Sequence, residues 1–200
     1  SSYSVHGEDG LGEAKINQRE GEEWWRIFPG RADELITKMA RQYPGEITLI
    51  AIGPLTNLAL GLRKDPEGLS QLKGLVVMGG AVRAPGNVTP YAEFNIYVDP
   101  LAAKMVFESG LPITLVPLDV THQVFLSPRV IEGRVKPLRN PFSQFVIEAT
   151  GYNSKERHFR AGSEVFHLHD PLAVGVVINP NLVRKERLPV SVETQEGERY

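Results

Sequence analysis

Four polar side chains follow an apolar run in the middle of the chain and could do chemistry together. The run GLVVM at residues 74–78 is typical of a strand covered on both faces, and Gly79 and Gly80 end it. Asn87, Thr89, Glu93 and Asn95 come next, where open α/β sheets place their ligands. Because a sugar diol needs donors and acceptors at close range, these groups could bind vicinal hydroxyls. The alternative is an ordinary turn-rich loop.

A second group of candidate side chains lies near the end of the chain, at His167, His169 and Asp170. Pro171 directly after the aspartate suits the first turn of a helix, so the carboxylate would sit where that helix begins. In an extended segment the two histidines would lie on one side, and imidazole suits zinc or iron. Residues taken alone therefore leave a transition-metal site open. Asp119, Thr121, His122 and Gln123 form a third polar group, in which His122 stays unassigned.

Apolar runs at 47–52, 74–78 and 113–118 are the strands that would position these groups, with helical patterns between them. We therefore expect one α/β domain over residues 1–200, with a mostly parallel central sheet flanked by helices. A dinucleotide-binding fold is the rival, but no GxGxxG opens a helix here.

The expected helices and last strand each have predicted inward residues. A helix at 31–43 would bury Leu35, Ile36, Met39 and Ala40. A helix at 99–109 would bury Leu101, Met105 and Val106. The helical region 127–161, with a break at Asn140 and Pro141, would bury Phe142, Phe145, Val146 and Ala149. Residues 188–194 are expected to form a final strand.

Amino-acid composition limits the classes of partner and of metal ligand that we expect for this protein. The 200 residues are 42% apolar, which is enough for a sizeable core, and 22 basic against 24 acidic residues give a net charge of −2. With this charge balance we expect no nucleic-acid partner. The sequence contains no apolar run long enough to cross a membrane, so we expect no membrane partner. Because cysteine is absent, a metal would need oxygen or imidazole ligands.

Five segments, in order, resemble the signature sequences of the inosine-uridine preferring nucleoside hydrolases. They are VHGEDGLG, IAIGPLTNLAL, MGGAVRAPGNVTPYAEFNIYVDPLAA, ITLVPLDVTHQV and FHLHDPLAVG. The resemblance implies hydrolysis of the N-glycosidic bond of a ribonucleoside, which releases ribose and a free purine or pyrimidine base. A histidine, His169, rather than a tryptophan stands beside Asp170, and this resembles family members that accept both kinds of base.

The resemblance also implies a calcium ion that activates water, held by the main-chain carbonyl of Thr56 and by Asp170. It implies that His169 helps to expel the base and that His6 lies near it. The other implied substrate contacts border the ribose or bind its hydroxyls: Met78, Asn87, Glu93, Phe94 and Asn95. We further expect a cytoplasmic homo-oligomer.

One departure from the family pattern is clear, because the family opens with an aspartate-rich DxDxGxDD segment that this sequence does not contain. The family's closing segment also looks shortened, and the chain starts at Ser1, which fits a fragment or a processed product. Residues 1–200 alone are therefore expected to be inactive and to bind calcium weakly. The alternative is a noncatalytic ribosyl-binding or scaffold protein derived from the hydrolase fold.

Overall fold

The computed structural model of the chain describes residues 28–150 and 165–195. Contacts divide these residues into two compact units, one of residues 28–124 and 169–195, the other of residues 125–150 and 165–168. The candidate site residues lie in the first unit except His167, which lies in the second unit, and His6, which lies outside the described residues. The single domain over residues 1–200 stays a prediction.

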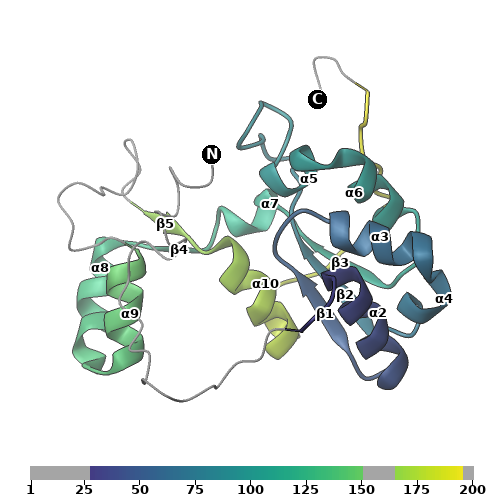
Figure 1. The fold of residues 1–200 in the computed structure, drawn as a ribbon. Coiled ribbons are helices and arrows are strands. Elements are labelled where there is room, and N and C mark those ends of the chain that lie inside the picture. The colour runs from purple at the N-terminus through teal and green to yellow at the C-terminus, as the bar shows by residue number, and fades with distance from the viewer. Residues whose placement is uncertain (1–27, 151–164, 196–200) are drawn as a thin grey trace. The chain divides into compact units, whose positions relative to one another are not determined.

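A parallel three-stranded sheet forms the centre of the first unit (Figure 1). Its strands are β1 (Thr48–Ala51), β2 (Gly74–Met78) and β3 (Ile113–Val116), in the order β1-β2-β3. Register pairs Thr48 with Gly74 and Leu75 with Ile113. The predicted α/β fold with a parallel sheet and flanking helices is therefore confirmed.

Helices cover both faces of this sheet. Leu75 and Val77 of β2 pack in a core cluster with residues of α2, α3 and α6, whereas Val76 and Met78 pack with residues of α10. Alternate residues of a strand point to opposite faces, so a strand buried on both faces must be apolar throughout, as residues 74–78 are. The helical elements described in this unit are α2 (Ala32–Gln42), α3 (Thr56–Lys64), α4 (Pro66–Leu69), α5 (Phe94–Val98), α6 (Pro100–Phe107), α7 (Leu118–Thr121), α10 (His169–Ile178) and η4 (Pro180–Leu182).

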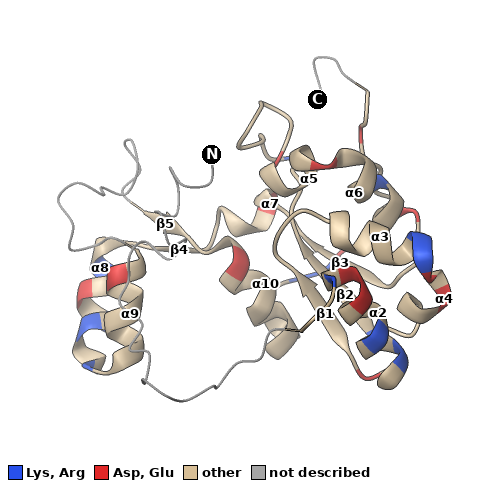
Figure 2. Ribbon diagram, in the orientation of Figure 1, with Lys and Arg blue, Asp and Glu red and all other residues tan. Residues whose placement is uncertain are grey.

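A buried carboxylate joins α2 to α3. Asp33 in the first turn of α2 is 1% exposed and lies 2.8 Å from the Nε of Arg31 and 2.7 Å from the Nζ of Lys64. Figure 2 shows the acidic start of α2 and the basic end of α3 that make this contact. The ion pair joins the start of α2 to the end of α3, and α3 begins at the predicted metal ligand Thr56.

The second unit contains an antiparallel pair of short strands and a set of helical turns. Asn140 begins α9 by accepting a hydrogen bond from the backbone N–H of Ser143 at 2.9 Å, which confirms the predicted helix start at Asn140 and Pro141. The described elements are β4 (Phe125–Leu126), α8 (Pro128–Val130), the π-helical η1 (Ile131–Val135), the 3-10 turn η2 (Lys136–Leu138), α9 (Pro141–Ala149) and β5 (Phe166–His167).

Three expectations about packing and strands were wrong. Leu101 is 68% exposed and Met105 is also exposed, because α6 turns Ala102, Ala103 and Val106 inward. Phe142 of α9 is 82% exposed and Phe145 is also exposed, whereas Ser143 and Ile147 are buried. Residues 188–194 form no strand, because they make no ladder hydrogen bonds with the described strands. Within the described residues, no helix combines the length and apolar character needed to cross a membrane.

Candidate active site

The candidate site lies at the edge of the sheet where the three parallel strands end. Thr56 follows β1, the loop with Asn87 and Glu93 follows β2, and Asp119 and Thr121 follow β3. Because neighbouring parallel strands run in the same direction, their carboxyl ends lie together, and all these groups lie beyond that end of the sheet. Thr56, Asn87 and Glu93, which the sequence predicts as site residues, therefore lie at the same end of the sheet.

The loop after β2 depends on Gly80. Its φ of +80° lies in the left-handed region, where a side chain would be strained. The backbone N–H of Gly80 donates to Oε2 of Glu93 at 2.9 Å, and its carbonyl accepts a hydrogen bond from the N–H of Leu118 at 2.9 Å. Gly80 therefore connects this loop to the starts of both α5 and α7.

Glu93 is the buried N-cap of α5 and is 3% exposed. Besides the bond from Gly80, its Oε2 accepts hydrogen bonds from the backbone N–H groups of Asn95 at 3.0 Å and Ile96 at 3.3 Å. A carboxylate at a helix N-terminus is stabilised by these N–H groups and by the helix dipole. The structure thus gives Glu93 a part in building the loop, and its contact with a sugar hydroxyl stays a prediction.

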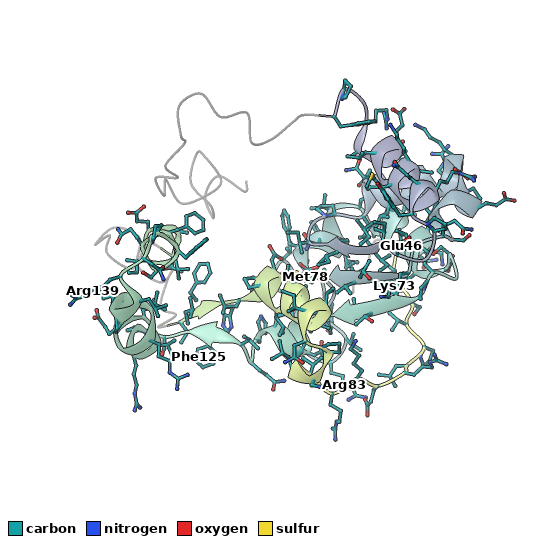
Figure 3. The ribbon with its side chains drawn as sticks, turned by 90° about the horizontal axis from the view of Figure 1, so that it is seen from below. Glu46, Lys73, Met78, Arg83, Phe125 and Arg139 are labelled. Carbon is teal, nitrogen blue, oxygen red and sulfur yellow. The ribbon has the colours of Figure 1, made fainter. Side chains whose placement is uncertain are left out.

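Asn95 is buried beside Met78, at 7% exposure. Its Nδ2 donates to the carbonyl oxygen of Met78 at 3.1 Å and lies 3.4 Å from the Met78 sulfur. Met78, labelled in Figure 3, is the last residue of β2 and packs in the core cluster under α10. Met78 and Asn95, two of the five residues predicted to border the ribose or bind its hydroxyls, are therefore direct neighbours.

Asn87 and Phe94 are also joined. The Asn87 Oδ1 accepts a hydrogen bond from the backbone N–H of Phe94 at 2.9 Å. The turn between them closes on itself, since the N–H groups of Asn87 and Val88 both donate to the carbonyl of Ala92. Both side chains are exposed, which leaves them accessible from solvent at the sheet edge.

Asp119 anchors the other half of this loop, a role that the sequence did not reveal. Its carboxylate accepts hydrogen bonds from the backbone N–H groups of Val82 at 2.9 Å, Arg83 at 2.7 Å and Ala84 at 3.2 Å. Burial raises the pKa of Asp119, but these hydrogen bonds outweigh it and hold the pKa below its usual value. Arg83 is labelled in Figure 3. The only sequence signal was an aspartate soon after a buried strand.

Thr56 begins α3, and its side chain joins that helix to α6. The Thr56 Oγ1 donates to Oδ2 of Asp99 at 2.6 Å, and Oδ1 of the same aspartate caps α6 through the N–H of Ala102 at 3.0 Å. The Thr56 hydroxyl therefore has a structural role, because its hydrogen bond links α3 to α6. The ligand proposed for a metal is the main-chain carbonyl, not this hydroxyl.

His169 and Asp170 are the first residues of α10, and both are half-buried. The Nδ1 of His169 lies 2.7 Å from Oγ1 of Thr121, and the ring of His122 meets the His169 ring edge-on at 5.7 Å. Sequence reasoning placed Thr121 and His122 at the end of β3 but did not connect them to His169. That connection depends on the packing of α10 against α7.

The oxygen and nitrogen atoms of the described residues show whether these residues could form a calcium site. Calcium takes six to eight oxygen ligands. Among the described residues, no three histidine, aspartate or glutamate side chains are grouped closely enough to hold a metal ion. Thr56 and Asp170 therefore do not make a complete calcium site by themselves.

Comparison with known proteins identifies the family. The sequence model of the inosine-uridine preferring nucleoside hydrolases matches residues 1–200, and the chain belongs to that family.

The relatives extend beyond the matched region. The chain is 39% identical to the pyrimidine-specific ribonucleoside hydrolase RihA of Photobacterium profundum, over 96% of this chain and 60% of that protein. It is 37% identical to a probable uridine nucleosidase 1 of Oryza sativa, over 96% of this chain and 57% of that protein. A purine-preferring ribonucleoside hydrolase from Gardnerella vaginalis superposes with a TM-score of 0.79 at 30% identity, over 98% of this chain and 60% of that one. The chain thus spans less than two thirds of the length of these proteins.

Proposed function

We propose that the protein hydrolyses the N-glycosidic bond of ribonucleosides and releases ribose and a free purine or pyrimidine base. The observation that carries this proposal is the family match over residues 1–200. The gathering of neutral donors and acceptors at the carboxyl edge of the sheet supports it, because such groups suit a sugar diol. Because the relatives are longer than this chain, the proposal concerns the whole protein.

In this reaction the bond between the anomeric carbon and the base nitrogen breaks, and the base leaves with the electron pair. The oxygen of water bonds to the anomeric carbon, and the base gains the proton that the water loses. Positive charge builds on the ribose and negative charge on the base, so the site must stabilise both.

We assign the sugar hydroxyls to Asn87, Glu93 and Asn95, and the border of the ribose to Met78 and Phe94. Burial of Glu93 and Asn95 in one hydrogen-bonded loop supports this assignment, because rigid groups lose little entropy when the sugar binds. His169 would donate a hydrogen bond to the departing base. His6, outside the described residues, would face the same base.

Calcium dependence is part of the proposal, with the Thr56 carbonyl and Asp170 as two of its ligands. A bound calcium ion would hold the ribose hydroxyls and lower the pKa of the attacking water. The remaining ligands must come from water, substrate or residues outside the described ranges. We also propose that residues 1–200 expressed alone bind calcium weakly and are inactive, which calorimetry and a ribose-release assay would measure.

We also propose that the protein is a cytoplasmic homo-oligomer, which cell fractionation and analytical ultracentrifugation would test.

The proposed substrate class is tested by measuring the release of reducing sugar from inosine, uridine and their 5′-phosphates by the whole protein. We expect turnover of the nucleosides. Turnover of the phosphorylated nucleotides without turnover of the nucleosides would contradict the proposed substrate.

A further inference from the structure

Thr121 is a fully buried threonine in contact with the histidine that we assign to the departing base. Its residue exposure is 0%, and its Oγ1 lies 2.7 Å from Nδ1 of His169. It ends α7, the turn that follows β3, while His169 begins α10, 48 residues further along the chain. The contact therefore joins two separate segments of the site.

The threonine hydroxyl is held in place by its surroundings. The backbone N–H of Thr121 donates to the carbonyl of Pro117 at 3.1 Å, and Leu118, at the start of the same turn, is buried in the core with Leu172 of α10. A β-branched side chain is stiff at χ1, so its hydroxyl has few alternative positions. The His169 ring itself has a second neighbour, the His122 ring, which contacts it edge-on at an interplanar angle of 66°.

A neutral imidazole has one N–H, and the partner of one ring nitrogen decides which nitrogen carries it. If the Thr121 hydroxyl donates to Nδ1, the proton of His169 must be on Nε2, which can then donate to a departing base. If Nδ1 instead donated to the hydroxyl, Nε2 would be an acceptor and could not stabilise the negative charge on the base. Only the first arrangement serves the proposed reaction.

We propose that Thr121 is a positioning residue, whose hydroxyl donates to Nδ1 of His169 and holds the ring with its N–H on Nε2, facing the departing base. The inference rests on the proposed nucleoside hydrolysis. It concerns the tautomer and orientation of a neutral ring, and Thr121 itself touches neither sugar nor base.

The kinetic test compares Thr121→Val, which keeps the shape but removes the hydroxyl, with Thr121→Ser, which keeps the hydroxyl. In the whole protein, Thr121→Val should lower kcat for uridine and inosine about tenfold or more, with KM changed less than about threefold. Thr121→Ser should stay within about threefold of the unsubstituted protein. Thr37→Val, which removes a hydroxyl bonded to the Asp33 carbonyl on α2, is the matched control and should leave kcat unchanged.

A second substrate separates positioning from general damage. The leaving group of 4-nitrophenyl riboside is a stable anion and needs no donor, so Thr121→Val should hydrolyse it within about threefold of the unsubstituted protein. An equal loss on both substrates, or no loss on the nucleosides, would overturn the inference.

A spectroscopic test does not depend on activity. Nitrogen-15 NMR of the His169 ring at about pH 8.5, above the usual histidine pKa of about 6.5, should show the proton on Nε2. Thr121→Val should increase the share of the Nδ1–H form. A proton on Nδ1 in the unsubstituted protein, or no change on substitution, would overturn the inference. If the protein hydrolyses no nucleoside, the proposed function fails, while this spectrum still decides the Thr121 contact.

Discussion

The carboxylate of Glu93 accepts a hydrogen bond from the backbone N–H of Gly80 at 2.9 Å, and this bond joins the end of β2 to the start of α5. It brings the residues on both sides of a 12-residue excursion, 81–92, to the same edge of the sheet. Asn95 and Met78 meet directly beside it. The geometry of the proposed sugar contacts therefore depends on one buried side chain.

Replacing Glu93 by alanine should lower both stability and activity. Three backbone N–H groups lose their acceptor and α5 loses its cap, so we expect the free energy of unfolding to fall by about 2–4 kcal/mol. Urea titration would measure this change. Glu93→Gln, which keeps one acceptor oxygen, should be less destabilised, and Glu46→Ala, at an exposed site, should match the unsubstituted protein. Equal stability of Glu93→Ala and the control would show that the cap is unimportant.

Asn95→Ala should act mainly on the reaction. If Asn95 binds a ribose hydroxyl more tightly as positive charge develops, its removal should lower kcat/KM by about 100-fold or more. Steady-state kinetics with uridine and inosine at temperatures well below the unfolding midpoint would measure it. A variant with near-normal kcat/KM would mean that the bond to the Met78 carbonyl is purely structural.

Asp119→Asn should destabilise the protein in a pH-dependent way. The pKa of Asp119 in the folded protein is lowered, so its ionised form adds stability above the unfolded pKa of about 3.9, and that stability is lost as the pH falls through the folded value. We expect a loss of about 1–2 kcal/mol at pH 7 that shrinks below about pH 4. Chemical unfolding of both proteins across this range would measure it, with Glu46→Gln as the matched control. A difference that stays constant or grows as the pH falls would contradict this role.

Removing calcium should abolish hydrolysis by the whole protein. Exhaustive chelation followed by a calcium titration should give loss and recovery of activity, and Asp170→Asn should need about tenfold more calcium or more for half-maximal rate. Glu108→Gln, an exposed carboxylate paired with Lys104, is the control. Undiminished turnover after chelation would exclude the calcium role.

Strand patterns were read correctly from the sequence where both faces are buried. Residues 74–78 were predicted with their observed bounds, and β1 and β3 begin and end within two residues of the predicted runs. These runs are apolar apart from Thr48 and Thr114, so the signal does not depend on knowing which face of the strand packs against which helices. Leu118 was assigned to the third strand but begins α7, because backbone pairing with β2 ends at Val116.

Helix faces and the site network needed the three-dimensional structure. In PLAAKMVF nearly every residue is apolar, so periodicity could not choose between Leu101 and the observed Ala102, Ala103 and Val106. In α9, Phe142, Phe145 and Ile147 offered more than one apolar face. The Thr121 contact with His169 and the Asp119 contacts with residues 82–84 join distant segments, and one sequence carries no signal for such pairings.

The most direct test of the central claim is to incubate the whole protein with uridine or inosine and to quantify free base and ribose by chromatography. We predict that base and ribose appear in equal amounts, with catalytic turnover and without phosphate. A protein that binds nucleosides by calorimetry with calcium present, yet releases neither base nor ribose, would contradict hydrolysis and would favour a noncatalytic ribosyl-binding protein built on the same fold.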